Sequence, residues 1–150
     1  MVANCFSASA FVKADTNPIK VASEMEKLNI VFNNEKYPFN KEEVDVVSQI
    51  IIKATKKVRE LLPQLNEQIT VNVLTIDRNL DIVGGVFGRA EAPGLVTINL
   101  STASKGGVIG SAKNALESSV FHEFHHLAMG WTMTENKYGN PAGIPIATVN

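Results

Sequence analysis

The strongest constraint on the fold of this chain is an apolar stripe between Asn40 and Pro63. Its members recur at steps of three and four, the spacing of one α-helix face; they are Val44, Val47, Ile51, Ala54, Val58 and Leu61. Asn40 can cap the first turn, and Glu43 three positions later completes a capping box. Because Pro63 cannot continue a helix, the pattern predicts one long helix over about residues 41–62.

After this helix the apolar period changes to two. Apolar and polar side chains alternate over residues 69–76, as in a half-buried strand. Residues 82–87 form a second candidate strand, with a bend or bulge at its two glycines, and residues 95–100 form a third. The short link between these two contains Pro93-Gly94, which is typical of a turn. We therefore expect the second and third strands to pair antiparallel.

The residues before the long helix give a weaker pattern. Asn17-Pro18 opens a segment with apolar residues at helical spacing up to Leu28, which predicts a short helix. Residues 29–39 are expected to be extended or loop. Residues 1–15 are interpreted either as a weakly packed terminal segment or as a remnant of an export signal, because a cleavage-like Ala-Ser-Ala occurs without a preceding basic residue. The second interpretation slightly favours an exported protein (cell envelope or extracellular) over a cytoplasmic one.

Length and composition restrict the functional class. A chain of 150 residues fits a single domain, residues 1–150, and 45% hydrophobic with 19% charged residues is typical of a globular protein. The net charge of -1 and the scattered basic residues argue against nucleic acid as a partner. No apolar run is long enough for a transmembrane segment. Cys5 is the only cysteine, so a thiolate-rich metal site is excluded. The oligomeric state is not indicated.

All three histidines lie within five consecutive residues, His122, His125 and His126. The stretch has the form H-E-x-x-H on a helix predicted over about residues 111–129. Positions i and i+4 share one helix face, so His122 and His126 can direct two imidazoles at one metal ion. Glu123 projects beside that site, where it can take a proton from a water activated by the ion. The pattern therefore predicts a metal centre with a glutamate base.

The rest of this helix agrees with that orientation. An apolar stripe lies opposite the two ligands and consists of Leu116, Val120, Phe124, Leu127 and Trp131. Small residues, Ala115, Ser118 and Ser119, lie on the ligand side and leave room for water and substrate. His125 lies about 60° from the line of the other two histidines. We expect His125 to be exposed or to orient a neighbouring group rather than to bind metal.

Three stretches resemble zincin-type metallopeptidases, and most closely a bacterial domain-of-unknown-function family of predicted Zn-dependent proteases. They are KKVRELLPQLNEQITVNVL, GGVFGRAEAPGLVTINLS and VFHEFHHL, which together span about half of the chain. The resemblance implies a zincin-like α+β fold, with a small, mostly antiparallel sheet packed on the helices at 41–62 and 111–129. It implies Zn²⁺ as cofactor, and an edge strand, residues 84–88 or 95–100, that pairs with an extended peptide substrate.

The third protein ligand of the metal is where the chain departs from that family. The family supplies a downstream glutamate in an E-G-L-A-like segment, which does not occur before Asn150. One interpretation is that the chain lacks a C-terminal part that holds this ligand. Another is a similarity to aspzincins, whose T-x-x-D-x-x-Y-G signature resembles residues 132–139. Glu135 would then be the third ligand and Tyr138 would steady the tetrahedral oxyanion, unless the segment is a surface loop with a solvated glutamate.

The function expected from these features is zinc-dependent hydrolysis of peptide bonds in a peptide or protein substrate. Two alternatives stay open at this point. One is a metal-dependent amidase that acts on a small amide or a cell-wall peptide. The other is a non-catalytic domain that binds a metal or a partner.

Overall fold

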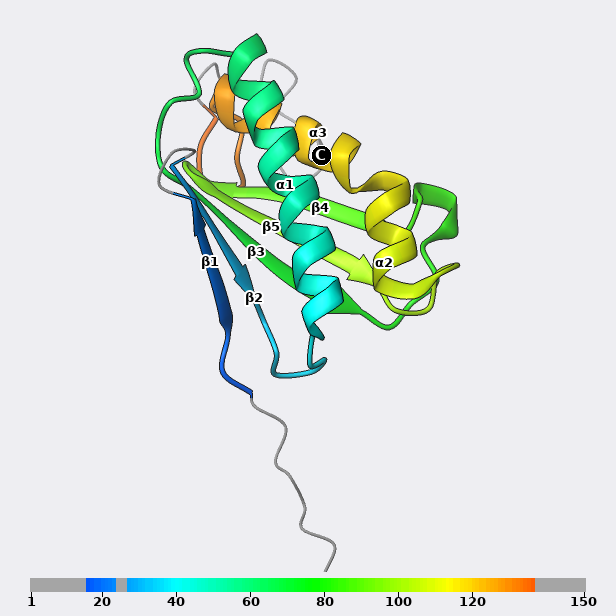
Figure 1. The fold of residues 1–150 in the computed structure, drawn as a ribbon. Helices are drawn as coiled ribbons and strands as arrows, with labels where there is room; N and C mark the ends of the chain where they lie inside the picture. Colours follow the sequence, from blue (N-terminus) through cyan, green and yellow to red (C-terminus); the bar gives the residue numbers. More distant parts are fainter. Residues whose placement is uncertain (1–15, 24–26, 137–150) are drawn as a thin grey trace, which may run out of the picture.

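The computed structural model describes residues 16–23 and 27–136, which form a two-layer α+β domain (Figure 1). A five-stranded sheet forms one layer, and the helices cover one of its faces. In chain order the elements are β1 (Ile19–Ser23), β2 (Leu28–Phe32), α1 (Lys41–Leu61), β3 (Ile69–Ile76), the 3-10 turn η2 (Asp81–Val83), β4 (Val86–Ala92), β5 (Leu95–Ser101), α2 (Gly107–Ser111), the π-helical turn η3 (Ala112–Leu116) and α3 (Glu117–Met129). The α+β class is as predicted.

The sheet is mixed, so the prediction of a mostly antiparallel sheet was wrong. Its strand order is β1-β2-β3-β5-β4, with parallel pairing of β2 with β3 and of β3 with β5. The other two pairs, β1 with β2 and β4 with β5, are antiparallel, the latter as predicted. Helix α1 provides the long crossover that the parallel pair β2 and β3 requires. Because β4 comes last in the strand order, it is an edge strand, whereas β5 is interior and cannot accept a substrate strand.

The segment after Pro18 is strand, not the predicted helix. Ile19–Ser23 pairs with Leu28–Phe32, and the latter strand adds to β3. Leu28, Ile30 and Phe32 are buried at alternate positions, so this face of β2 belongs to the core. Antiparallel pairing of β1 with β2, which itself pairs with β3, outweighs the local spacing up to Leu28 that suggested a helix.

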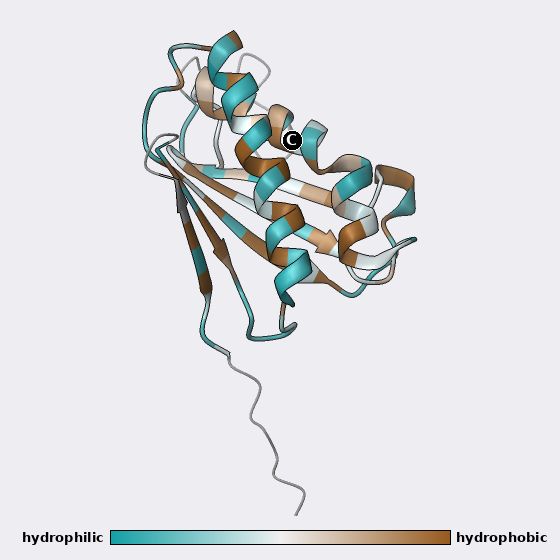
Figure 2. Cartoon of the chain, in the orientation of Figure 1, coloured by the Kyte–Doolittle hydropathy of each residue, from teal (hydrophilic) through white to brown (hydrophobic). Residues whose placement is uncertain are grey.

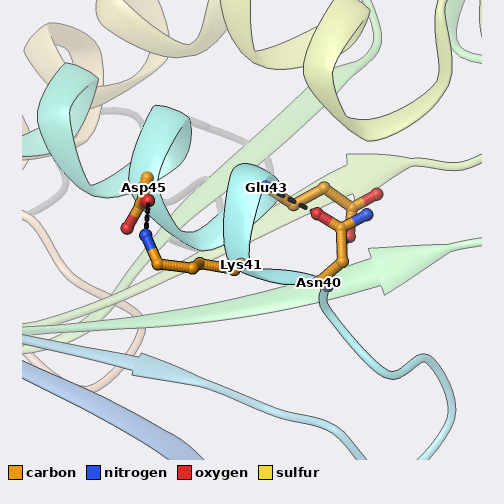
Figure 3. A network of polar contacts seen from close by, with 4 residues as sticks. All are labelled: Asn40, Lys41, Glu43 and Asp45. Atoms are coloured by element: carbon orange, nitrogen blue, oxygen red, sulfur yellow. Dashed lines mark hydrogen bonds and ion pairs between the residues drawn. The ribbon is translucent and has the colours of Figure 1, made fainter.

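Helix α1 is as predicted, including its cap (Figure 3). Asn40 Oδ1 accepts a hydrogen bond from the backbone N–H of Glu43 at 2.9 Å, and Glu43 Oε2 accepts one from the N–H of Asn40 at 3.0 Å. Glu43 also accepts a 2.6 Å hydrogen bond from the Tyr37 hydroxyl. Four stripe residues are buried, namely Val47, Ile51, Ala54 and Val58. Leu61, the last member, is 71% exposed because the helix ends there.

The helical run that carries the histidines begins at Gly107, earlier than the predicted start at about residue 111. Ser111 is buried inside the run, and its hydroxyl donates to the carbonyl of Ser101 at 3.2 Å. The π-helical turn Ala112–Leu116 directly precedes α3. Such turns are frequent at functional sites because they change which residues face a neighbouring element.

The second predicted strand begins later than expected. Residues 81–83 form η2, a bend follows at Gly84 and Gly85, and the strand starts at Val86. The bend was predicted, and both glycines adopt positive φ, 75° and 89°. Ile82 is left 97% exposed.

The core lies between the sheet and the helices. Hydrophobic residues are spread along the strands and recur on α1 and α3 (Figure 2). Ile69, Val71 and Val73 of β3 are fully buried there, while the alternate residues are only half-buried. None of the helices in the described part of the chain is both long enough and apolar enough to span a bilayer.

Candidate functional site

The two predicted metal ligands converge on α3. The Nε2 atoms of His122 and His126 lie 3.0 Å apart, and their ring centroids are 4.6 Å apart. Two nitrogens that bind one tetrahedral zinc at about 2.0–2.1 Å are separated by about 3.3 Å. The pair therefore fits a shared divalent cation with only a small adjustment of the rings.

The two imidazoles have different surroundings. The side chain of His122 is 58% exposed, whereas His126 is 5% exposed. Burial lowers the pKa of His126, and the neighbouring charges of His122 and His125 lower it further. The neutral imidazole, which is the form that binds a metal, is thus favoured. Nδ1 of His126 is buried and has no hydrogen-bond partner among the described residues.

Glu123 is buried beside the pair. It is 3% exposed, and its Oε1 lies 3.9 Å from Nε2 of His122. Burial raises the pKa of this carboxyl; the charge of His122 and a backbone hydrogen bond from Ala90 oppose that rise, and Glu91 adds to it. Its Oε2 is buried and has no hydrogen-bond partner in the described part of the chain. The carboxylate is thus hydrogen-bonded to Ala90 while its Oε2 is buried and unpaired.

A glycine of β4 makes room for this carboxylate. A Cβ atom built on Gly88 would lie 2.6 Å from Cγ and 2.9 Å from Oε1 of Glu123. Both distances are too short for any side chain, so Glu123 occupies the space that a residue other than glycine would fill. Strand β4 and α3 can therefore approach closely enough to bury the carboxylate between them.

A groove of about 450 Å³ opens beside the site. Its lining comes from η2, β4 and α3: Val83, Val86, Phe87, Gly88, Ser118, Ser119, His122 and Glu123. Ser118 and Ser119 lie on the ligand side, as predicted. Ala115 does not line the groove; it packs against Gly84, where an added Cβ would lie 2.6 Å from its own.

The outer edge of β4 is free next to Glu123. The carbonyl of Ala90 accepts a hydrogen bond from the backbone N–H of Met133 at 3.0 Å, and the N–H of Ala90 bonds to the carboxylate of Glu123. Both groups therefore point away from β5. Because backbone groups alternate in direction along a strand, those of Val86 and Gly88 point the same way. No described residue provides them with a partner.

The remaining predicted residues lie around this pair. His125 is exposed, as expected, with its ring centroid 6.4 Å from that of His126. Trp131 follows the end of α3 at Gly130 and is half-buried in a bridge with Asn136, so it is not part of the helical stripe. The other stripe members are buried, namely Leu116, Val120, Phe124 and Leu127.

The third metal ligand stays a prediction. Within residues 16–23 and 27–136, no three His, Cys, Asp or Glu side chains gather into a group that could hold one ion. Glu135 is exposed in a turn closed by Thr132, whose hydroxyl accepts from the N–H of Glu135 at 3.0 Å. Tyr138 and any ligand beyond Asn150 lie outside the described residues.

The sequence pattern did not identify Gly88 or the apolar side of the groove. The only local signal is the G-G-V-F-G run, in which glycines at residues 84, 85 and 88 surround two large apolar residues. The role of that run depends on its packing against α3.

No protein-family model, curated protein or solved structure matches this chain, so the candidate site is supported by its own geometry.

Proposed function

We propose that this chain is a zinc-dependent peptidase. The observation that carries the proposal is the convergence of two imidazole nitrogens, 3.0 Å apart, beside a buried carboxylate that faces an open groove. Burial of the Glu123 carboxylate costs free energy, and a helix with a purely structural role would gain nothing from it. A hydrolytic site needs both the buried carboxylate and the accessible imidazole of His122.

His122 and His126 would hold the metal, with Glu135 as the candidate third protein ligand. Imidazole and carboxylate suit zinc, and the sequence offers no thiolate cluster in their place. When bound, zinc polarises the scissile carbonyl and makes water more acidic.

Glu123 would act as the general base and then as the general acid. Burial raises the pKa of its carboxyl toward the range in which it can both accept and return a proton. The backbone of Ala90 orients the carboxylate, which can take a proton from the attacking water and deliver it to the departing amine. Oε2 has no hydrogen-bond partner among the described residues, so it can accept a proton without breaking an existing bond.

An extended peptide would be held by strand addition to β4. The outward backbone groups of Val86 and Gly88 offer two consecutive pairing positions beside Glu123. Pairing ends at Ala90, whose carbonyl is occupied by Met133. This free edge favours a peptide over a small amide, which has no backbone to pair.

The test combines metal content with turnover. The purified protein is analysed for bound zinc, and hydrolysis of a quenched-peptide panel is measured with and without chelator. We expect chelator-sensitive activity that Glu123→Gln reduces by at least about 10²-fold with zinc retained, and that His126→Ala abolishes together with zinc. His125→Ala is the matched control and should retain both.

Two results would overturn the proposal. Hydrolysis that survives the chelator, or that is undiminished in Glu123→Gln, excludes this mechanism. Zinc binding without turnover of any peptide would instead indicate a non-catalytic metal-binding domain.

A further inference from the structure

Exposed hydrophobic side chains gather at the groove. Four large hydrophobic residues are strongly exposed in the described part of the chain, and three of them belong to η2 and the start of β4: Ile82 at 97%, Val83 at 52% and Phe87 at 50%. Val83 and Phe87 line the same groove as His122 and Glu123. Single exposed apolar residues are common, but a contiguous group beside a candidate site indicates binding.

The apolar wall of the groove (Val83, Val86 and Phe87) is held in place by hydrogen bonds on both sides of η2. The N–H of Leu80 donates to Ser104 Oγ at 2.7 Å, and Asp81 Oδ1 accepts from the N–H of Lys105 at 2.9 Å. Beyond the turn, the carbonyl of Gly84 accepts from Asn114 Nδ2 at 3.2 Å. The wall therefore cannot easily fold inward to hide its side chains. A surface preorganised in this way binds an apolar group at a lower entropic cost than a mobile loop would.

The groove contains little that would receive a charged side chain. Opposite the wall lie Ser118 and Ser119, which are small and uncharged. Among the described residues, the ionisable groups that line it are His122 and Glu123, which the proposed reaction uses. A charged substrate group would lose its water at the wall without gaining a partner.

We propose that the apolar wall selects a large apolar side chain of the substrate beside the scissile bond. This inference rests on the proposed peptidase function and names its substrate class: extended polypeptide segments rich in Leu, Phe or similar residues, as unfolded proteins expose. Strongly charged cell-wall peptides do not fit. Val83 and Phe87, the exposed members of the wall, are the specificity-determining residues.

The test uses two acetylated decapeptides with Gly/Ser flanks that differ only in having Phe or Asp at the central position. With the zinc-loaded protein we expect kcat/KM to be at least about 10-fold higher for the Phe peptide, the discrimination that burial of an apolar group supports. Val83→Asp and Phe87→Asp should remove most of this preference. Leu61→Asp is the matched control, because Leu61 is also exposed, at 71%, but lies at the end of α1.

Binding separates this inference from the proposed function. Fluorescence anisotropy of the labelled peptides is measured with Glu123→Gln protein, which needs no chemistry. Preferential binding of the Phe peptide, if Val83→Asp abolishes it, supports the apolar wall even when the wild-type protein cleaves no peptide. That absence of cleavage would overturn only the proposed peptidase function. Equal binding of both peptides, or a preference that survives in Val83→Asp and Phe87→Asp, overturns the inference while leaving measured peptidase activity in place.

Discussion

The close approach of β4 to α3 gives the sharpest prediction, the substitution Gly88→Ala. The new Cβ would lie 2.6 Å from Glu123 Cγ, and ordinary contact begins near 3.4 Å, so one of the two must move by roughly 0.8 Å. Gly88 does not have a positive φ, so alanine introduces no backbone strain of its own. Any loss of unfolding free energy should therefore arise from the contact with Glu123.

Its magnitude follows from this geometry. Overpacking of a close contact costs about 1–3 kcal/mol of unfolding free energy. A displacement of about 1 Å of a catalytic group reduces the rate by about 10²-fold. In a strand without the contact, alanine is instead better than glycine by about 0.5–1 kcal/mol. Gly88→Ala should therefore lower the unfolding free energy when residue 123 is glutamate and leave it unchanged or raise it when residue 123 is alanine.

The assay is a double-mutant cycle in urea. Unfolding free energies are measured for wild type, Gly88→Ala, Glu123→Ala and the double variant, with peptide hydrolysis measured on the first two. We expect Gly88→Ala to destabilise the wild type and to be neutral or stabilising when Glu123 is absent. An equal cost in both backgrounds would refute the reasoning, because the contact would then not be the cause.

Three further predictions concern the histidines and the start of α1. His126→Ala should lower zinc affinity at least about 10-fold more than His125→Ala, measured by competition with a chelating dye. Asn40→Ala should cost about 1 kcal/mol in urea unfolding. Lys41→Ala, which removes only an exposed ion pair, should cost clearly less; equal costs would contradict the capping box. The pKa of Tyr37 is raised from 10.0 to about 12 by its hydrogen bond to Glu43, by burial and by the charge of Glu43. Stability present below pH 10 should therefore fall between about pH 10 and 12, a loss absent from Tyr37→Phe and measurable by thermal melts.

Local sequence patterns predicted the elements that are determined by residues close together in the chain. The cap and stripe of α1, the alternation in β3 and β5, and the spacing of His122 and His126 each depend on residues within a few turns or positions. Strand β1 shows the opposite case. The apolar spacing of the segment that contains it also fits a helix, and only its pairing with β2 makes it a strand.

The candidate site divides in the same way. The sequence by itself determined that two imidazoles and a carboxylate share one stretch of helix, because 3.6 residues per turn place them there whatever surrounds them. Only the tertiary structure decided that β4 is the edge of a mixed sheet, that the missing side chain of Gly88 leaves room for Glu123, and that an apolar wall borders the groove. These features depend on which strand lies beside α3, and that is decided by the packing of distant segments rather than by any local spacing of residues.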